Sequence, residues 1–182
     1  FNEAISGLTP STTYYFRAYA TNSAGTSTGS ILSFTTSAPG VPTVTTQSAS
    51  SITATTATGN GNITSTGGVN ATVRGVAYGL TTAYGATTTE NGSFSTGAFT
   101  ASMTGLTCNT TYHYRAYAAN TSGTSTGSDV TFTTSPCAPT VVTSAASSVT
   151  MSTVTLNGSI SATGGANATQ SGFAYGTKSI ST

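Results

Sequence analysis

The sequence is poor in charge. It holds four basic and three acidic side chains among 182 residues, and its net charge is +1. This balance offers no basic surface for nucleic acid and no acidic tail, so we expect no nucleic-acid partner. The carboxylates Glu3, Glu90 and Asp129 are far apart in the sequence. Their isolation argues against paired acid/base catalysis and against a calcium site, which takes about 6–8 oxygen ligands.

Residues that carry catalysis or bind metals are also scarce. His113 is the only histidine, and no carboxylate or second histidine lies near it in the sequence. A general base needs a positioned partner and a metal site needs several ligands, so we interpret His113 as an ordinary surface residue. The Gly-x-Gly at Gly59 lacks the following helix of a phosphate-binding loop. The sequence thus predicts no enzyme, no cofactor and no metal.

Long apolar runs are absent as well. No stretch approaches the roughly 18–20 apolar residues of a membrane span, so we expect none. The chain begins Phe-Asn-Glu, with neither Met nor an apolar leader. We therefore expect a mature or excised piece whose targeting signal lies elsewhere.

What the sequence does contain is the composition of strands. Ser and Thr make up roughly two-fifths of it, and there are nine Tyr and seven Phe. Aromatic and β-branched residues favour strands, and disordered chains are poor in them. The stretch "TYYFRAYA" alternates, which places Tyr14 and Phe16 on one face and Tyr15 and Arg17 on the other. Clusters such as "NSAGTSTG" mark turns, and the pattern predicts an all-β fold.

The chain repeats itself. "GLTPSTTYYFRAYATNSAGTSTG" from Gly7 matches "GLTCNTTYHYRAYAANTSGTSTG" from Gly105, a shift of 98 residues. "STGGVNATVRGVAYG" from Ser65 matches "ATGGANATQSGFAYG" from Ala162, a shift of 97 residues. This period is longer than solenoid units of about 20–50 residues and equals a small β-sandwich of about 100. The sequence therefore predicts tandem β-sandwiches.

The first of these repeats resembles the E–F loop and F strand of fibronectin type III domains, in which a Leu-x-Pro-x-x-x-Tyr run forms the tyrosine corner. Leu8, Pro10 and Tyr14 fill those positions, and Tyr112 fills the last of them in the second copy. Cys108 replaces the proline there. The motifs are most similar to tandem repeats of large secreted surface or fibre proteins of Bacteroidota-like bacteria. The resemblance implies Ig-like or fibronectin type III-like sandwiches with tyrosine corners at Tyr14 and Tyr112.

By this resemblance, one complete unit lies between two half units. Residues 1–38 match strands E to G of a preceding repeat, and residues 139–182 match strands A to C of a following one. The strands expected in the complete unit, residues 39–138, are in order Val41–Thr46, Ile52–Ile63, Thr72–Gly79, Thr82–Glu90, Phe94–Leu106, Thr111–Ala119 and Gly127–Thr134. Its expected core includes Val76, Tyr78, Tyr112, Tyr114 and Phe132.

The outward-facing residues of the F strand form a polar and aromatic stripe. In the complete unit the stripe consists of His113, Arg115 and Tyr117, and Arg17 is the counterpart of Arg115 in the first copy. Two interpretations stay open, a surface for a ligand or cross-strand stabilisation of the sheet. Arg74 has the inward parity of the predicted core, so we expect its stem to cover that core.

The two cysteines flank the predicted hairpin of strands F and G. Cys108 precedes strand F, Cys137 follows strand G, and their midpoint falls between Ser122 and Gly123, at the predicted turn. They should therefore lie opposite each other at the open end of the hairpin. We predict a disulfide, with two free thiols as the alternative. A disulfide indicates an oxidising, extracellular location.

Seven asparagines stand in Asn-x-Ser/Thr triplets and are candidate glycosylation sites: Asn62, Asn70, Asn91, Asn109, Asn120, Asn157 and Asn167. In a chain this rich in Ser and Thr, most such triplets are expected by chance. They matter only where the producing cell glycosylates asparagine. O-linked sugar on the Thr-rich faces is a further candidate modification.

The half units lead to the functional hypothesis. Three strands with an open apolar face do not stay ordered alone. We therefore expect the C-terminal half of one copy to pack with the N-terminal half of the next, either within a longer polypeptide or between chains. Pairing of the two halves of one copy is the alternative. A head-to-tail contact that does not close builds a filament, which predicts an extracellular fibre. The other hypothesis is an adhesin, or a spacer beside a carbohydrate-active domain, with a glycan or surface ligand.

Overall fold

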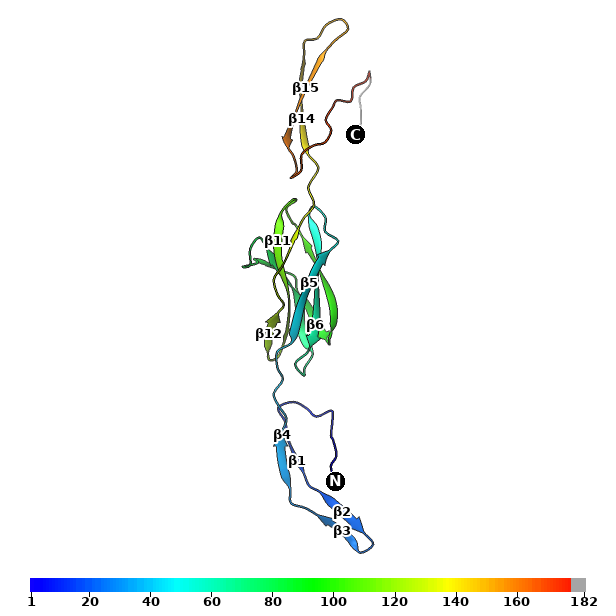
Figure 1. Cartoon of the computed structure of the whole chain (residues 1–182), viewed down its shortest axis with the longest axis vertical. Helices are drawn as coiled ribbons and strands as arrows, with labels where there is room; N and C mark the ends of the chain where they lie inside the picture. Colours follow the sequence, from blue (N-terminus) through cyan, green and yellow to red (C-terminus); the bar gives the residue numbers. More distant parts are fainter. Residues whose placement is uncertain (178–182) are drawn as a thin grey trace.

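The computed structural model describes residues 1–177, and these contain strands and turns but no helix (Figure 1). The fold class is all-β, as the sequence predicts. A sandwich in the middle of the chain lies between two thinner segments that extend from its opposite ends (Figure 1). Within the described residues, no strand of the N-terminal segment contacts a strand of the C-terminal segment.

The middle unit consists of two antiparallel sheets. The first has the order β10–β6–β5, with strands Gly97–Thr104, Thr56–Ser65 and Thr43–Ser50. The second contains β7 (Ala71–Gly79), β8 (Ala86–Thr87), β9 (Glu90–Phe94), β11 (Thr111–Asn120), β12 (Gly123–Thr126) and β13 (Val130–Thr133). Strand β11 pairs with β7 on one side and with β12 and β13 on the other. The two sheets are the A–B–E and C′–C–F–G sheets of the predicted sandwich.

The core lies between the two sheets because their strands alternate. Every second residue of β11 is buried, beginning with Tyr112, and most of those between are half-buried. The predicted core residues Val76, Tyr112, Tyr114 and Phe132 are buried, which confirms their placement. Tyr78 is half-buried at the edge of the same cluster.

Two predicted strands are divided by close contacts between strands. Strand G is interrupted between β12 and β13, where Thr46 of β5 comes against Gly127. There the backbone N–H of Ala116 donates to the Thr46 hydroxyl at 3.0 Å. The predicted strand C′, Thr82–Glu90, forms only as the short β8 and at Glu90, and β9 continues to Phe94, where strand E was predicted to begin; strand E starts instead at Gly97. Between β8 and β9, the carbonyl of Thr88 lies where a β-carbon of residue 75 would stand, and Gly75 makes this approach possible.

The second strand of the sandwich begins at Thr56, four residues after the predicted start. A turn held by Thr53 precedes it, because the Thr53 hydroxyl accepts a hydrogen bond from the Thr56 N–H at 2.9 Å. The same turn occurs in the C-terminal segment, where the Thr150 hydroxyl accepts from the Thr153 N–H at 2.9 Å. The repeat therefore reproduces local structure as well as sequence.

The end segments form only some of their predicted strands. The pairs that form are β1 (Thr13–Phe16) with β4 (Leu32–Thr35), β2 (Tyr19–Asn22) with β3 (Gly25–Thr28), and β14 (Thr140–Ser147) with β15 (Thr155–Ala162). Residues 1–8, expected as strand E, and residues 169–176, expected as strand C, form no strand. In the middle unit strand E pairs with B and strand C with F. Each missing strand thus lacks a partner that lies in the other half.

Candidate functional site

The N-terminal segment exposes a cluster of aromatic rings. Tyr14 stacks on Phe34 with ring centroids 5.8 Å apart, and Phe16 meets the same ring edge-on at 6.0 Å. The middle unit holds the matching trio, including Tyr114 edge-on to Phe132 at 5.8 Å. Phe16 is 48% exposed and Phe34 39%, whereas Tyr114 is 0% and Phe132 7% exposed. The same arrangement of rings is buried in the middle unit and exposed in the N-terminal segment.

The C-terminal segment exposes a groove with apolar and polar side chains in its lining. It has a volume of about 540 Å³ and lies between β14, β15 and the residues after them, with Val141, Ile160, Ala168 and Phe173 in its lining. Val141 is 67% and Ile160 41% exposed. Their counterparts in the middle unit, 97 residues earlier, are buried.

Every buried apolar residue of the middle unit has an apolar counterpart in one of the two end segments. Five belong to strands A to C and match, at a shift of 97, Val141, Val154, Ile160, Ala168 and Phe173. Eight belong to strands E to G and match, at a shift of 98, Phe1, Ile5, Leu8, Tyr14, Phe16, Ala18, Ala20 and Phe34. The two ends together therefore carry one whole sandwich core, divided between them.

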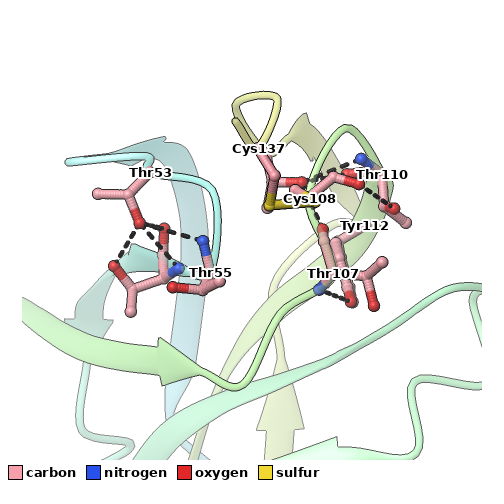
Figure 2. The surroundings of a disulfide bond; sticks show 9 residues. Thr53, Thr55, Thr107, Cys108, Thr110, Tyr112 and Cys137 are labelled. Atoms are coloured by element: carbon pink, nitrogen blue, oxygen red, sulfur yellow. Dashed lines mark hydrogen bonds between the residues drawn. A yellow bond between two sulfur atoms is a disulfide. The ribbon is translucent and has the colours of Figure 1, made fainter. Parts of the chain in front are cut away.

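The predicted disulfide is present. Cys108 and Cys137 are bonded at the open end of the β11–β13 hairpin, with their α-carbons 5.6 Å apart (Figure 2). The Thr110 hydroxyl donates to the Cys108 carbonyl at 2.9 Å beside it. The backbone N–H of Cys137 donates to the Gly164 carbonyl at 2.8 Å. The disulfide-bonded Cys137 thus connects the middle unit to the turn that follows β15 in the C-terminal segment.

Both tyrosines assigned to the corner make the expected type of contact. The Tyr112 hydroxyl accepts a hydrogen bond from the Thr107 N–H at 2.9 Å (Figure 2). The Tyr14 hydroxyl accepts one from the Thr9 N–H at 2.9 Å, and hydrogen bonding with Thr9 lowers the pKa of Tyr14. The N-terminal segment therefore keeps the local structure of the loop that precedes strand F.

The candidate glycosylation sites differ in what surrounds them. Asn120 is buried, and its Nδ2, the atom that would carry a glycan, donates to the carbonyls of Gly40, Thr66 and Val69 at 2.8, 3.0 and 3.3 Å. The folded unit therefore leaves no place for a glycan at Asn120, a correction to the sequence-based list. Among the remaining sites, Asn70, Asn91, Asn109 and Asn167 are exposed, Asn62 is half-buried, and the half-buried Asn157 donates through its Nδ2 to the carbonyl of Ala145.

The outer stripe contains a charged cluster that the sequence did not indicate. His113 Nδ1 lies 2.7 Å from an Asp129 carboxylate oxygen, and the Tyr84 hydroxyl donates to the other oxygen at 2.9 Å. The hydrogen bond with His113 is the main cause that lowers the pKa of Asp129, while burial raises the pKa of Tyr84. The guanidinium of Arg115 stacks over the Tyr84 ring at 4.6 Å. Asp129 lies 16 residues from His113, just before the strand that pairs with β11, so only the register could have revealed it.

Arg74 covers the core edge as predicted. Its guanidinium lies 4.0 Å from the centre of the Phe94 ring and 5.2 Å from that of Phe99. Its Nε lies 2.7 Å from a Glu90 carboxylate oxygen.

Within residues 1–177, no three His, Cys, Asp or Glu side chains gather as metal ligands would. The same part of the chain contains no helix that could cross a membrane.

The strand order and core define an all-β protein whose middle unit is a sandwich of the Ig-like and fibronectin type III-like class. No protein-family model and no curated protein matches the chain. Among solved structures, the sensor domain of the anti-sigma factor RsgI4 from Pseudobacteroides cellulosolvens shares 20% identity over 52% of this chain and 94% of its own, with a TM-score of 0.43. Domains A168–A170 of titin share 17% identity over 66% and 40% of the two chains, with a TM-score of 0.37. The FN1–FN3 domains of chicken CNTN1 share 18% over 71% and 45%, with a TM-score of 0.39.

Proposed function

We propose that the chain is a structural segment of an extracellular fibre built from tandem β-sandwich repeats, in which each half unit is completed by the adjacent copy. The observation that carries this proposal is the divided core. The exposed apolar side chains of the two ends match, position by position, the two halves of a core that is buried in the middle unit. The adjacent copy belongs either to a longer polypeptide or to a separate chain.

Completion has a large driving force. Burying one Leu, Ile or Phe side chain fully contributes about 1.5–3 kcal/mol. Phe1, Ile5, Val141 and Phe173 are among the large apolar side chains that the two ends expose. Monomeric proteins rarely leave large contiguous apolar patches in water. Because the two faces lie at opposite ends of the molecule (Figure 1), their mutual burial links copies head to tail and leads to an open filament.

The proposal includes a location outside the cell and a passive role. The Cys108–Cys137 disulfide is the kind of bond that persists in oxidising compartments. A surface rich in Ser and Thr hydroxyls and poor in charge suits a spacer that bonds mainly to water. The resemblance to repeats of secreted bacterial surface proteins points the same way. We propose no catalytic activity.

A second candidate function is adhesion through the outer face of the middle unit. The observation behind it is the cluster of His113, Arg115, Asp129 and Tyr84, which lies on one face of the second sheet. Its first-copy positions hold Tyr15, Arg17 and Ile31, so the cluster is particular to the middle unit. Glycan array binding by the wild-type protein, lost in an Arg115→Ala variant, would favour adhesion over a purely structural role.

The test of the fibre proposal is assembly of the full chain. Sedimentation velocity and electron microscopy of the oxidised protein should show oligomers that grow with concentration into thin filaments. The variant Phe16→Asp places a charge in the exposed core half of β1 and should remain monomeric. The variant Tyr15→Asp, on the opposite face of the same strand, is the matched control and should still assemble. A wild-type chain that stays monomeric at high concentration contradicts completion by a separate chain.

A further inference from the structure

We infer that the groove of the C-terminal segment is filled by the N-terminal segment of a second copy of this chain, in a defined strand register closed by Asn22. This inference rests on the proposed function and names the residues that meet where the two copies join, a contact called the seam below. The middle unit is the template, because both halves of the seam are copies of its two halves.

The register follows from the pairing of β11 with β7. In the middle unit, Arg115 lies opposite Ala77 and Tyr117 opposite Gly75. Shifted by 98 and 97 residues, these pairs become Arg17 opposite Ala174 and Tyr19 opposite Gly172 of the second copy. Residues 170–176 form no strand in the single chain, so their backbone groups have no ladder partner there. A second copy in this register supplies one.

The lining of the groove corresponds to one half of a core cluster of the middle unit. The second core cluster of the middle unit joins Val44, Ile63, Ala71, Phe99, Ala116 and Ala118. The counterparts of the first three are Val141, Ile160 and Ala168, which line the groove. The counterparts of the last three are Phe1, Ala18 and Ala20, all exposed in the N-terminal segment. The occupant therefore brings the residues that the groove lacks.

One residue in the groove has to move. Phe173, the counterpart of the smaller Val76, leans over Gly158, and its ring atoms lie 3.2 and 3.3 Å from where a β-carbon of residue 158 would stand. In the middle unit the ring of Phe99 covers the matching Gly61. The Phe173 ring must therefore turn aside when Phe1 of the second copy enters.

Asn22 takes the place at the seam that Asn120 has in the middle unit, where it hydrogen-bonds to neighbouring backbone groups. Asn120 Nδ2 donates to the carbonyls of Gly40, Thr66 and Val69, and its Oδ1 accepts from the Ser122 N–H at 2.8 Å. Asn22 makes the matching local bond, accepting from the Ala24 N–H at 2.9 Å. Among the described residues its Nδ2 donates to nothing.

The C-terminal segment contains the three acceptors that the Nδ2 group of Asn22 would bind. They are the carbonyls of Cys137, Thr163 and Ala166, the counterparts of those that Asn120 binds. The turn that presents them is already formed, since Cys137 N donates to Gly164 O at 2.8 Å just as Gly40 N donates to Gly67 O at 2.8 Å. This polar contact fixes which end of the groove the Asn22 turn occupies, which makes the docking directional.

The seam also differs from the middle unit at one edge. In the middle unit the Thr88 carbonyl covers Gly75, but a β-carbon at Gly172 would meet nothing within 4 Å. The edge beside residues 170–176 is therefore open in the structure, so Cys substitutions there are accessible to oxidation.

A register-specific crosslink tests the inference. The double variant Arg17→Cys, Ala174→Cys places two thiols opposite each other, at the spacing of paired α-carbons that a disulfide can bridge. The control, Thr21→Cys with Ala174→Cys, keeps the same face but slips by four residues, about 13 Å along the strand. Mild oxidation of the full chain should give a ladder of covalent multimers on a non-reducing gel for the matched pair and not for the slipped pair. Adding Asn22→Ala to the matched pair should reduce the multimer fraction at least severalfold.

The outcomes separate this inference from the proposed function. A ladder confined to the matched pair supports both. If both cysteine pairs give equal ladders, or if filaments form but the matched pair gives no ladder, the proposed strand register is wrong. The fibre proposal is not affected by either result. Neither filaments nor a ladder overturns both. An unchanged multimer fraction with Asn22→Ala overturns the role of Asn22.

Discussion

The ring of Phe99 lies against the backbone of Gly61, and its nearest atom is 2.5 Å from where a β-carbon of residue 61 would stand. The two residues face each other in the adjacent strands β10 and β6 of the first sheet, and the ring belongs to the second core cluster. The methyl group of Ala116, from the second sheet, approaches the same point to 2.7 Å. The two sheets therefore pack together here over a residue without a side chain.

The first prediction follows from that contact. Gly61→Ala should lower the free energy of unfolding of the middle unit by about 1–3 kcal/mol, because the added methyl group displaces the Phe99 ring in a packed core. Urea unfolding of the full chain measures the change. Gly172→Ala is the matched control, since a β-carbon there meets nothing within 4 Å, and it should leave the unfolding of the middle unit unchanged.

The second prediction concerns the disulfide. Replacing Cys108 and Cys137 by Ser should lower the free energy of unfolding of the middle unit by about 3–4 kcal/mol, because a cross-link spanning 29 residues restricts the unfolded chain. The unit should still fold, since Pro10 stands at the position of Cys108 in the first copy. Adding a reducing agent to wild-type protein should give the same loss. A wild-type stability unaffected by reduction contradicts the assignment.

The third prediction concerns Asn120. Asn120→Ala leaves the carbonyls of Gly40, Thr66 and Val69 without their shared donor, and should lower the free energy of unfolding by about 1–3 kcal/mol. Asn91→Ala is the control, because Asn91 also stands in an Asn-x-Ser/Thr triplet but is exposed. Its stability should equal that of the wild type within error. Equal losses in both variants would show that the three bonds do not stabilise the unit.

The fourth prediction concerns pH. The pKa of Asp129 is lower in the folded unit than its ordinary value, chiefly because of the hydrogen bond with His113. Such a carboxyl stabilises the fold above its unfolded pKa of about 3.9, and that stabilisation is lost as the pH falls through the folded pKa. The difference in melting temperature between wild type and Asp129→Asn should therefore be present near neutral pH and shrink below about pH 4. A difference that grows as the pH falls below about 4 contradicts the pairing.

The sequence predicted the sandwich because alternation along one strand carried the information. The alternating residues of β11 set the core face, and the hairpin placed Cys108 opposite Cys137. The sequence pattern could not predict contacts between strands that are distant in sequence. The interruption of strand G depends on Thr46, which arrives from β5, and the contact of His113 with Asp129 depends on where β13 starts.

The end segments show a second limit of sequence-based prediction. Residues 1–8 and 169–176 have the pattern of strands E and C, yet neither forms a strand in the single chain. A strand needs a partner as well as a pattern. In the middle unit strands E and C pair with strands B and F, and the counterparts of B and F lie in the opposite end segment of this chain.

The most direct test of completion by an adjacent copy is amide hydrogen exchange of the assembled protein, measured by mass spectrometry on peptides covering residues 18–22 and 170–176. If a second copy completes each half unit, both peptides should be protected to about the same degree as their counterparts in the middle unit, residues 116–120 and 73–79, and should lose that protection in the monomeric Phe16→Asp variant. If both peptides exchange in assembled material as fast as in that variant, the half sandwiches are not completed by their neighbours, and the central claim is contradicted.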